Sequence, residues 1–350
     1  MTIDLLSLTP EAARSALADW LSARGEPAYR IRQILPRLWQ RPVGRWSDAT
    51  DLPAPLRTAL DAALPLQRLT LRTHQVSSDG TVKFLWALAD GEAIESVLIP
   101  EGKRRTLCIS SQAGCALGCV FCAAGRMGFR RNLSAGEIAG QVREMVLRDP
   151  AQQPTNVVFM GMGEPLLNWD AVDTTLTILN QPEGFGIGAR HITVSTVGIL
   201  PNLAKFAKRG EQFRLAVSLH APSPALRREL MPIEKKYTLP ELTAALKQFR
   251  RRVTLEYAGT DARLRAASEA ARRRGCVAAE PRPRHQRGLR SATGGSRRSA
   301  SRPPPPGAES RRRGARSHRV SARCRAEPRC APPPAPRARA RPLSRDRGGR

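Results

Sequence analysis

The stretch Cys115-Ala-Leu-Gly-Cys119-Val-Phe-Cys122 places three cysteines at a C-x3-C-x2-C spacing on one short loop. Three thiolates can hold a 4Fe–4S cube and leave its fourth iron free to bind a substrate or cofactor. The alternative is structural zinc, which takes four ligands, usually as two pairs. The distant Cys276, Cys324 and Cys330 lie in a segment that we expect to be disordered. The spacing therefore favours an iron–sulfur cluster with an open site over zinc.

Strand-like runs and amphipathic helices alternate around this loop. The strand-like runs span residues 106–111, 156–160, 191–195, 213–219 and 253–257, and the helical runs span 135–148, 169–180, 200–208 and 239–250. Ser134 and Glu137 form a capping-box pattern at the start of the first of these helices. The alternation predicts parallel βαβ units in an α/β fold, as an open sheet or a partial (βα) barrel. Such folds carry active sites on loops after their strands, which is where the cysteine loop lies.

Four segments are expected along the chain. Residues 1–65 form a small helical accessory domain, with helices from Pro10 to about Gly25, over 29–39 and over 55–63. Residues 66–100 form a β-hairpin and strand extension, with strands near 69–74, 82–88 and 94–99. Residues 101–257 form the α/β core, and residues 258–350 form an Arg/Pro/Ala-rich tail.

The charge of the chain is concentrated in that tail. The formal net charge is +28, of which +21 falls on residues 251–350 and +7 on the first 250 residues. Basic charge favours a polyanionic partner such as RNA, although a solvated basic surface explains +7 equally well. The tail has few large apolar residues to offset the entropy of ordering, so we expect it to be disordered.

The expected cellular compartment follows from the absence of membrane-spanning and export signals in the sequence. No run reaches the roughly 18 apolar residues that span a membrane, and residues 1–10 do not form a signal peptide. Seven cysteines in such a chain are expected to be reduced thiols for metal or redox chemistry. A cytoplasmic protein is predicted, with no membrane partner.

A family resemblance is carried by several blocks in order. Met160-Gly-Met-Gly-Glu-Pro-Leu-Leu-Asn168 is one, and the others span residues 108–115, 129–137, 192–198 and 215–221 together with the cysteine loop. Over about 5–257 the chain resembles the RlmN type of radical S-adenosylmethionine enzymes. The resemblance implies a partial (βα) barrel, a 4Fe–4S cluster and S-adenosyl-L-methionine. It further implies methylation of adenine C2 in 23S rRNA (adenine 2503) and tRNA (adenine 37), with a reductant protein as electron donor.

The resemblance also assigns roles to residues. Cys115, Cys119 and Cys122 match the cluster ligands. The positions matching cofactor contacts are Gly163, Glu164, Ser195, Ser218, Leu219 and His220. Glu95 matches the proton acceptor, and Cys108 matches a resolving thiol that forms a disulfide when the product is released. Taken alone, a strand glutamate or an isolated cysteine is more often a surface or packing residue.

The resemblance ends near Tyr257. The family continues with a further strand and a Cys-Gly segment that carries the methylated cysteine, and neither is present here. Our hypothesis is a frameshift after Tyr257, which leaves the methyl-carrying cysteine unassigned and the activity of this chain open. Two alternatives remain: a C8-specific radical RNA methyltransferase, and a defective iron–sulfur protein that binds RNA without methyl transfer.

Overall fold

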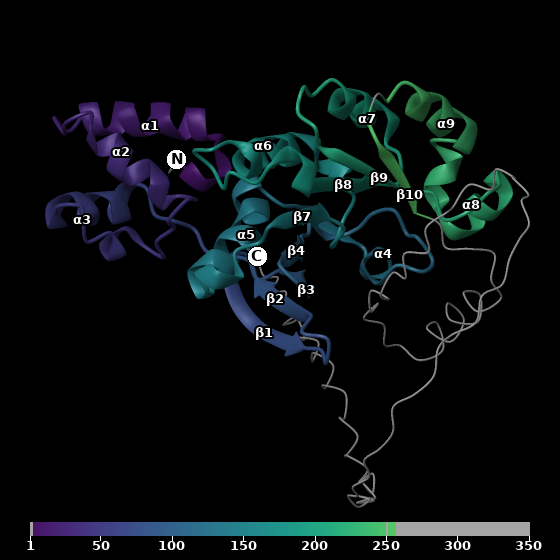
Figure 1. The fold of residues 1–350 in the computed structure, drawn as a ribbon, viewed down its shortest axis with the longest axis horizontal. Coiled ribbons are helices and arrows are strands. Elements are labelled where there is room, and N and C mark those ends of the chain that lie inside the picture. The colour runs from purple at the N-terminus through teal and green to yellow at the C-terminus, as the bar shows by residue number, and fades with distance from the viewer. Residues whose placement is uncertain (1–2, 250, 257–350) are drawn as a thin grey trace, which may run out of the picture. The chain divides into compact units, whose positions relative to one another are not determined.

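The computed structural model describes residues 3–249 and 251–256, so the expected tail and its cysteines lie outside the described residues. One large sheet organises the described part (Figure 1). Its strands, in spatial order, are β1 (Thr70–Val76), β2 (Val82–Ala87), β3 (Ala93–Glu101), β4 (Arg104–Cys108), β7 (Asn156–Phe159), β8 (Ile192–Thr196), β9 (Arg214–Ser218) and β10 (Val253–Glu256). Strands β1 to β4 pair antiparallel, whereas β4, β7, β8, β9 and β10 run parallel. A separate small sheet joins β5 (Gln112–Gly114) to β6 (Phe129–Asn132).

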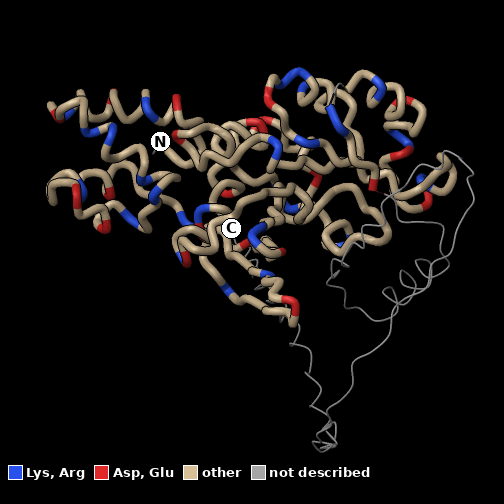
Figure 2. Tube along the Cα trace, viewed as in Figure 1, with Lys and Arg blue, Asp and Glu red and all other residues tan. Residues whose placement is uncertain are grey.

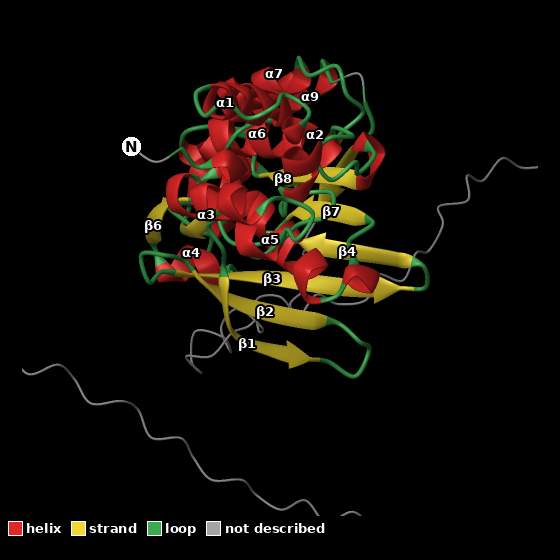
Figure 3. Cartoon of the chain, turned by 90° about the vertical axis from the view of Figure 1, so that its left-hand side faces the viewer, coloured by secondary structure: helices red, strands yellow, loops and turns green. Residues whose placement is uncertain are grey.

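Helices connect the parallel strands and form the first part of the chain. The α-helices are α1 (Pro10–Ser22), α2 (Arg30–Ile34), α3 (Ala54–Ala63), α4 (Ala123–Met127), α5 (Ala135–Arg148), α6 (Trp169–Asn180), α7 (Leu200–Ala207), α8 (Pro224–Leu230) and α9 (Leu239–Lys247). Short 3-10 turns are η1 (Leu5–Ser7), η2 (Leu35–Arg37), η3 (Trp46–Asp48), η4 (Pro150–Gln152), η5 (Pro165–Asn168), η6 (Ala189–His191) and η7 (Pro232–Lys235). Figure 3 shows α5 and α6 lying along one face of the sheet.

The predicted α/β fold with parallel βα units is confirmed. The expected strand over 106–111 is different, because β4 ends at Cys108 and the chain then turns into the separate strand β5. Helices α4 and α8 were not predicted, since five and seven residues are too short to show helical periodicity. Within the described residues, no helix is both long and apolar enough to cross a membrane.

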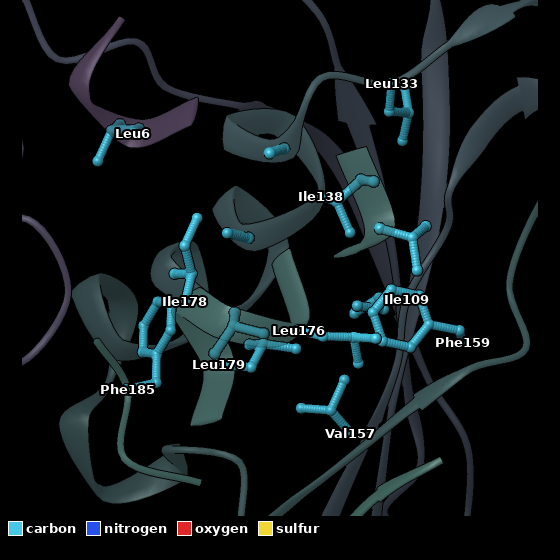
Figure 4. Packing of buried hydrophobic residues seen from close by; sticks show 14 of the residues in the cluster. Leu6, Ile109, Leu133, Ile138, Val157, Phe159, Leu176, Ile178, Leu179 and Phe185 are labelled. Carbon is cyan, nitrogen blue, oxygen red and sulfur yellow. The ribbon is translucent and has the colours of Figure 1, made fainter. Parts of the chain in front are cut away.

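Helix α5 illustrates how sequence sets local structure. Ser134 accepts a hydrogen bond from the amide of Glu137, whose carboxylate accepts one from the Ser134 amide, so the predicted capping box is present. Its apolar face packs on the sheet, and Figure 4 shows Ile138 near Ile109 and Phe159. Buried Gln141 bonds both backbone groups of Ser110, through Oε1 at 2.9 Å and Nε2 at 2.8 Å. The helix thereby fixes the chain just beyond β4.

The N-terminal segment shares the core of the sheet. Buried side chains from Leu5 to Leu242 form one continuous hydrophobic cluster. Arg143 on α5 is almost fully buried and donates to the carbonyls of Leu38 and Val43. These bonds tie the loop after α2 to the helix that supports the cysteine-bearing segment.

Candidate active site

The predicted site residues gather where the parallel strands end. The segments after β4, β7, β8 and β9 all leave the sheet at the carboxyl ends of their strands, which lie at one edge of a parallel array. Each of these segments carries residues singled out in the sequence. The structure therefore brings together residues from about 95 to 256 that are far apart along the chain.

The cysteine loop is held tightly at its start. Gly114 has φ +76°, and a Cβ there would lie 1.8 Å from the carbonyl oxygen of Gly128. This close approach allows the Cys115 amide to donate to that carbonyl at 3.0 Å. Further along, the Val120 amide donates to the carbonyl of Leu230, at the end of α8, at 3.0 Å. Glycine is required at 114 because any side chain there would force the backbone at Gly114 away from the backbone at Gly128.

The three thiols of this loop lie close enough for their charges to affect one another. Cys115 and Cys119 are each 7% exposed, and Cys122 is half-buried. Burial, together with the smaller effects of the neighbouring Cys122 and Cys115, raises the pKa of Cys119 to about 12. Burial likewise raises the pKa of Cys115, where nearby Cys122 adds to the effect. Desolvated thiols of this kind ionise when a metal centre supplies compensating positive charge.

This donor set fits a 4Fe–4S cluster. Among residues 3–249 and 251–256, no three His, Cys, Asp or Glu side chains already converge on one point as ligands of a single metal ion do. A cube makes a different demand, because each thiolate binds a different iron and the sulfurs remain separated. Three thiols on one loop, two of them buried, satisfy that demand and leave one iron open.

The turn after β7 faces the cysteine loop. Gly163 has φ +97°, and a Cβ there would lie 2.5 Å from Cβ of Gln112. Glu164 is 3% exposed, and its carboxylate is one of the charges acting on Cys115 and Cys119. Glycine therefore occupies the position where the backbone of this turn packs too closely on β5 to admit a side chain.

The Glu164 carboxylate is largely occupied by the protein itself. Oε1 accepts from Thr196 Oγ1 at 2.6 Å and from the Leu166 amide at 3.0 Å, and Oε2 accepts from the Val197 amide at 2.9 Å. Burial raises the pKa of Glu164 to about 6 despite these bonds. A carboxylate has about four acceptor positions, so room remains for roughly one more donor.

A row of hydroxyl groups crosses the next strands. Ser195 Oγ lies 3.4 Å from Ser218 Oγ, which lies 3.4 Å from Glu256 Oε2. The predicted Ser195 and Ser218 are thus neighbours. Glu256 was missed, because only the register of β10 beside β9 brings it to Ser218.

His220 closes this side of the site. It has φ +59°, which is uncommon for a residue with a side chain, and its amide and that of Leu219 both donate to the Glu256 carbonyl, at 2.9 and 3.0 Å. Its ring packs edge-on against Phe121 of the cysteine loop at 4.7 Å between centroids. Burial and, as a smaller effect, the charge of Arg227 lower the pKa of His220 to about 4. The imidazole is therefore neutral at pH 7, and its buried Nδ1 has no partner among the described residues.

Glu95 and Cys108 lie on neighbouring strands. Cys108 pairs in register with Val97 on β3, and the Glu95 carbonyl accepts from Ser110 Oγ at 2.6 Å, beside the end of β4. The Glu95 side chain is 42% exposed and lies 3.3 Å from Lys83 Nζ. Burial raises the pKa of Cys108 to about 12, with a contribution from Glu256.

The expected disulfide is not present among the described residues. Cys108, Cys115, Cys119 and Cys122 are all free thiols. A partner for Cys108 in the C-terminal part of the chain lies outside the described residues.

Comparison with known proteins decides the family. Residues 109–258 match the radical SAM superfamily. A probable dual-specificity RNA methyltransferase RlmN of Gemmatimonas aurantiaca is 58% identical over 254 residues, which cover 73% of this chain and 71% of that protein. The chain belongs to the RlmN family. The Syntrophobacter fumaroxidans RlmN is 44% identical, over 69% of this chain and 72% of its own length.

A solved structure agrees with this assignment. A radical SAM methyltransferase from Sphaerobacter thermophilus is 40% identical, with a TM-score of 0.68 over 78% of this chain and 82% of that one. The family is enzymatic, and it implies a 4Fe–4S cluster and S-adenosylmethionine. Membership in the RlmN family therefore agrees with the donor set described above.

Proposed function

We propose that this chain is an RNA methyltransferase of the RlmN type, acting on adenine C2 in 23S rRNA and tRNA. The observation that carries the proposal is the loop of Cys115, Cys119 and Cys122 beside the Glu164 turn. Curated relatives with the RlmN name are dual-specificity RNA methyltransferases. A cytoplasmic location and an electron-donating partner protein belong to the same proposal.

The chain's own residues would first hold the cofactors. Cys115, Cys119 and Cys122 hold the cluster, which together with S-adenosylmethionine supplies radical chemistry at a carbon that ordinary methyl transfer does not reach. Glu164 offers its remaining acceptor position to the ammonium group of the cofactor. Gly163 keeps the turn close enough for that contact.

Further contacts come from the neighbouring strands. Ser195 and Ser218 offer hydroxyl groups from the ends of β8 and β9, and Leu219 offers apolar surface. Neutral His220 offers Nδ1, which has no partner within residues 3–249 and 251–256, as a hydrogen-bonding group. Together these residues orient the cofactor on the inner side of the strand ends.

Glu95 and Cys108 act on the substrate side in this proposal. Glu95 takes the proton from adenine C2, for which its exposed carboxylate on β3 is accessible. Cys108 would release the product as a resolving thiol, by forming a disulfide with the methyl-carrying cysteine while that cysteine's sulfur–carbon bond to the RNA adduct breaks. The methyl-carrying cysteine is not assigned, because Cys276, Cys324 and Cys330 lie outside the described residues.

Charge alone supports RNA binding only weakly. Figure 2 shows Lys and Arg interspersed with Asp and Glu along the described helices. This pattern suits contacts with a phosphate backbone at scattered points, and such binding weakens as salt rises. The proposal therefore depends on the site and on family membership.

The test uses cells that lack their own adenine-C2 methyltransferase. They receive either this chain or a chimera in which the C-terminal segment of the Gemmatimonas relative follows Tyr257. Mass spectrometry of digested RNA should find C2-methyladenine with the chimera and none with its Cys119→Ala variant. C8-methyladenine would favour the C8-specific alternative, and unmodified RNA with the chimera would contradict the proposal.

A further inference from the structure

Helix α8 carries a fully buried ion pair beside the site. Arg227 on α8 and Glu234 on η7 are both 0% exposed and their side chains are in contact through Arg227 Nη1 and Glu234 Oε2. Glu234 Oε1 also accepts from the Leu239 amide at 2.9 Å. Removing two such charges from water is costly, and a buried pair often contributes no net stability compared with apolar side chains of similar size. Its presence here calls for a role other than stability.

The other terminal nitrogen of the Arg227 guanidinium contacts the segment that follows β8. Nη2 donates to the Val197 carbonyl at 2.7 Å. The amide of the same Val197 donates to Glu164 Oε2 at 2.9 Å. Val197 is therefore held from both sides, by Arg227 at its carbonyl and by Glu164 at its amide.

The same helix also contacts the cysteine loop. The carbonyl of Leu230, the last residue of α8, accepts from the Val120 amide between Cys119 and Phe121. The charge of Arg227 also lowers the pKa of His220, whose ring packs on Phe121. One short helix thus joins the cluster loop, the end of β8 and the end of β9.

We infer that the Arg227–Glu234 pair is a positioning element of the S-adenosylmethionine site, fixing Val197 so that Glu164 keeps its orientation. Glu234 orients the guanidinium, whose planar fork can bond a carboxylate and a carbonyl at once. Neither residue needs to touch the cofactor. The inference rests on the proposed function, because it assumes that Glu164 faces the cofactor.

The experiment separates positioning from stability. Arg227→Met/Glu234→Met removes both charges together, so neither is left buried without its partner, and keeps apolar volume. It leaves the Val197 carbonyl and the Leu239 amide without their side-chain partners, so the unfolding temperature should fall by about as much as in the control variant below. Each full-length variant is reconstituted anaerobically with iron and sulfide, and S-adenosylmethionine binding is measured by equilibrium dialysis. We expect unchanged iron content and an affinity at least about tenfold weaker. Arg227→Lys retains the charge without the fork and should weaken binding at least threefold.

Arg143→Met is the matched control. Arg143 is an equally buried arginine that donates to two backbone carbonyls, but at the N-terminal segment rather than at β8. It should lower the unfolding temperature and leave affinity unchanged.

Unchanged affinity in whichever of the Arg227 variants fold would overturn the inference. If the unaltered chain takes up iron but binds no S-adenosylmethionine, the proposed function fails and the inference with it.

Discussion

Replacing Gly114 by alanine should disrupt the cysteine loop, whereas the same change at Gly118 should not. Both glycines precede a cysteine and have positive φ, +76° and +62°. An alanine in this region of φ costs about 1–2 kcal/mol at either position. At Gly118 no atom of the part of the chain that the structure describes lies within 4 Å of the added Cβ, but at Gly114 the Gly128 oxygen would lie 1.8 Å away.

The difference between the two variants follows from that contact. Relieving it requires a backbone shift of more than about 1 Å, which breaks the bond from the Cys115 amide to Gly128. A buried donor left unpaired costs a further ~1–3 kcal/mol. Gly114→Ala should therefore lose about 2–5 kcal/mol of unfolding free energy, and Gly118→Ala about 1–2 kcal/mol.

Two assays compare these variants with the unaltered chain. Urea unfolding of the metal-free protein gives the free energies, and iron analysis after anaerobic reconstitution reports on the loop. Gly118→Ala should keep nearly full iron content, and Gly114→Ala should lose most of it. Equal stability and equal iron content in the two variants would refute the reasoning, because the close approach at Gly128 would then have no consequence.

Two further predictions concern buried polar groups. Because the pKa of Glu164 is raised from 4.5 to about 6, its contribution to stability is present below pH 4.5 and is lost as pH rises through 6. Between pH 4.5 and 7, the unfolding free energy of the unaltered chain should thus fall by about 2 kcal/mol more than that of Glu164→Gln. A difference in unfolding free energy between the two proteins that does not change with pH would contradict this. Gln141→Leu leaves both backbone groups of Ser110 unpaired, so we expect a loss of about 2–4 kcal/mol. Calorimetry should show the unfolding temperature lower by roughly 5–15 °C, and a shift below about 2 °C would count against it.

Local patterns predicted most of the fold. Helices α5 and α6 begin and end at the residues expected from periodicity and, for α5, from the Ser134 capping box. Helix α8 was missed because seven residues show no clear period, although Ser223 followed by Pro224 is a helix-start signal that could have revealed it. The turn between β4 and β5 was missed because it depends on pairing with β6.

The site was only partly readable from the sequence. The spacing of Cys115, Cys119 and Cys122 indicates a cluster directly, since all three lie on one loop. Glu256 and Arg227 carry no such signal, because their partners come from other strands and loops. For the same reason the sequence could not show that three protein donors already bind the Glu164 carboxylate.

The most direct test of the account is electron paramagnetic resonance of the anaerobically reconstituted and reduced chain, recorded with and without S-adenosylmethionine. An open iron held beside the Glu164 turn predicts a 4Fe–4S signal whose shape changes when the cofactor is added. Bound zinc in place of iron, or a cluster signal that the cofactor leaves unchanged, would contradict it.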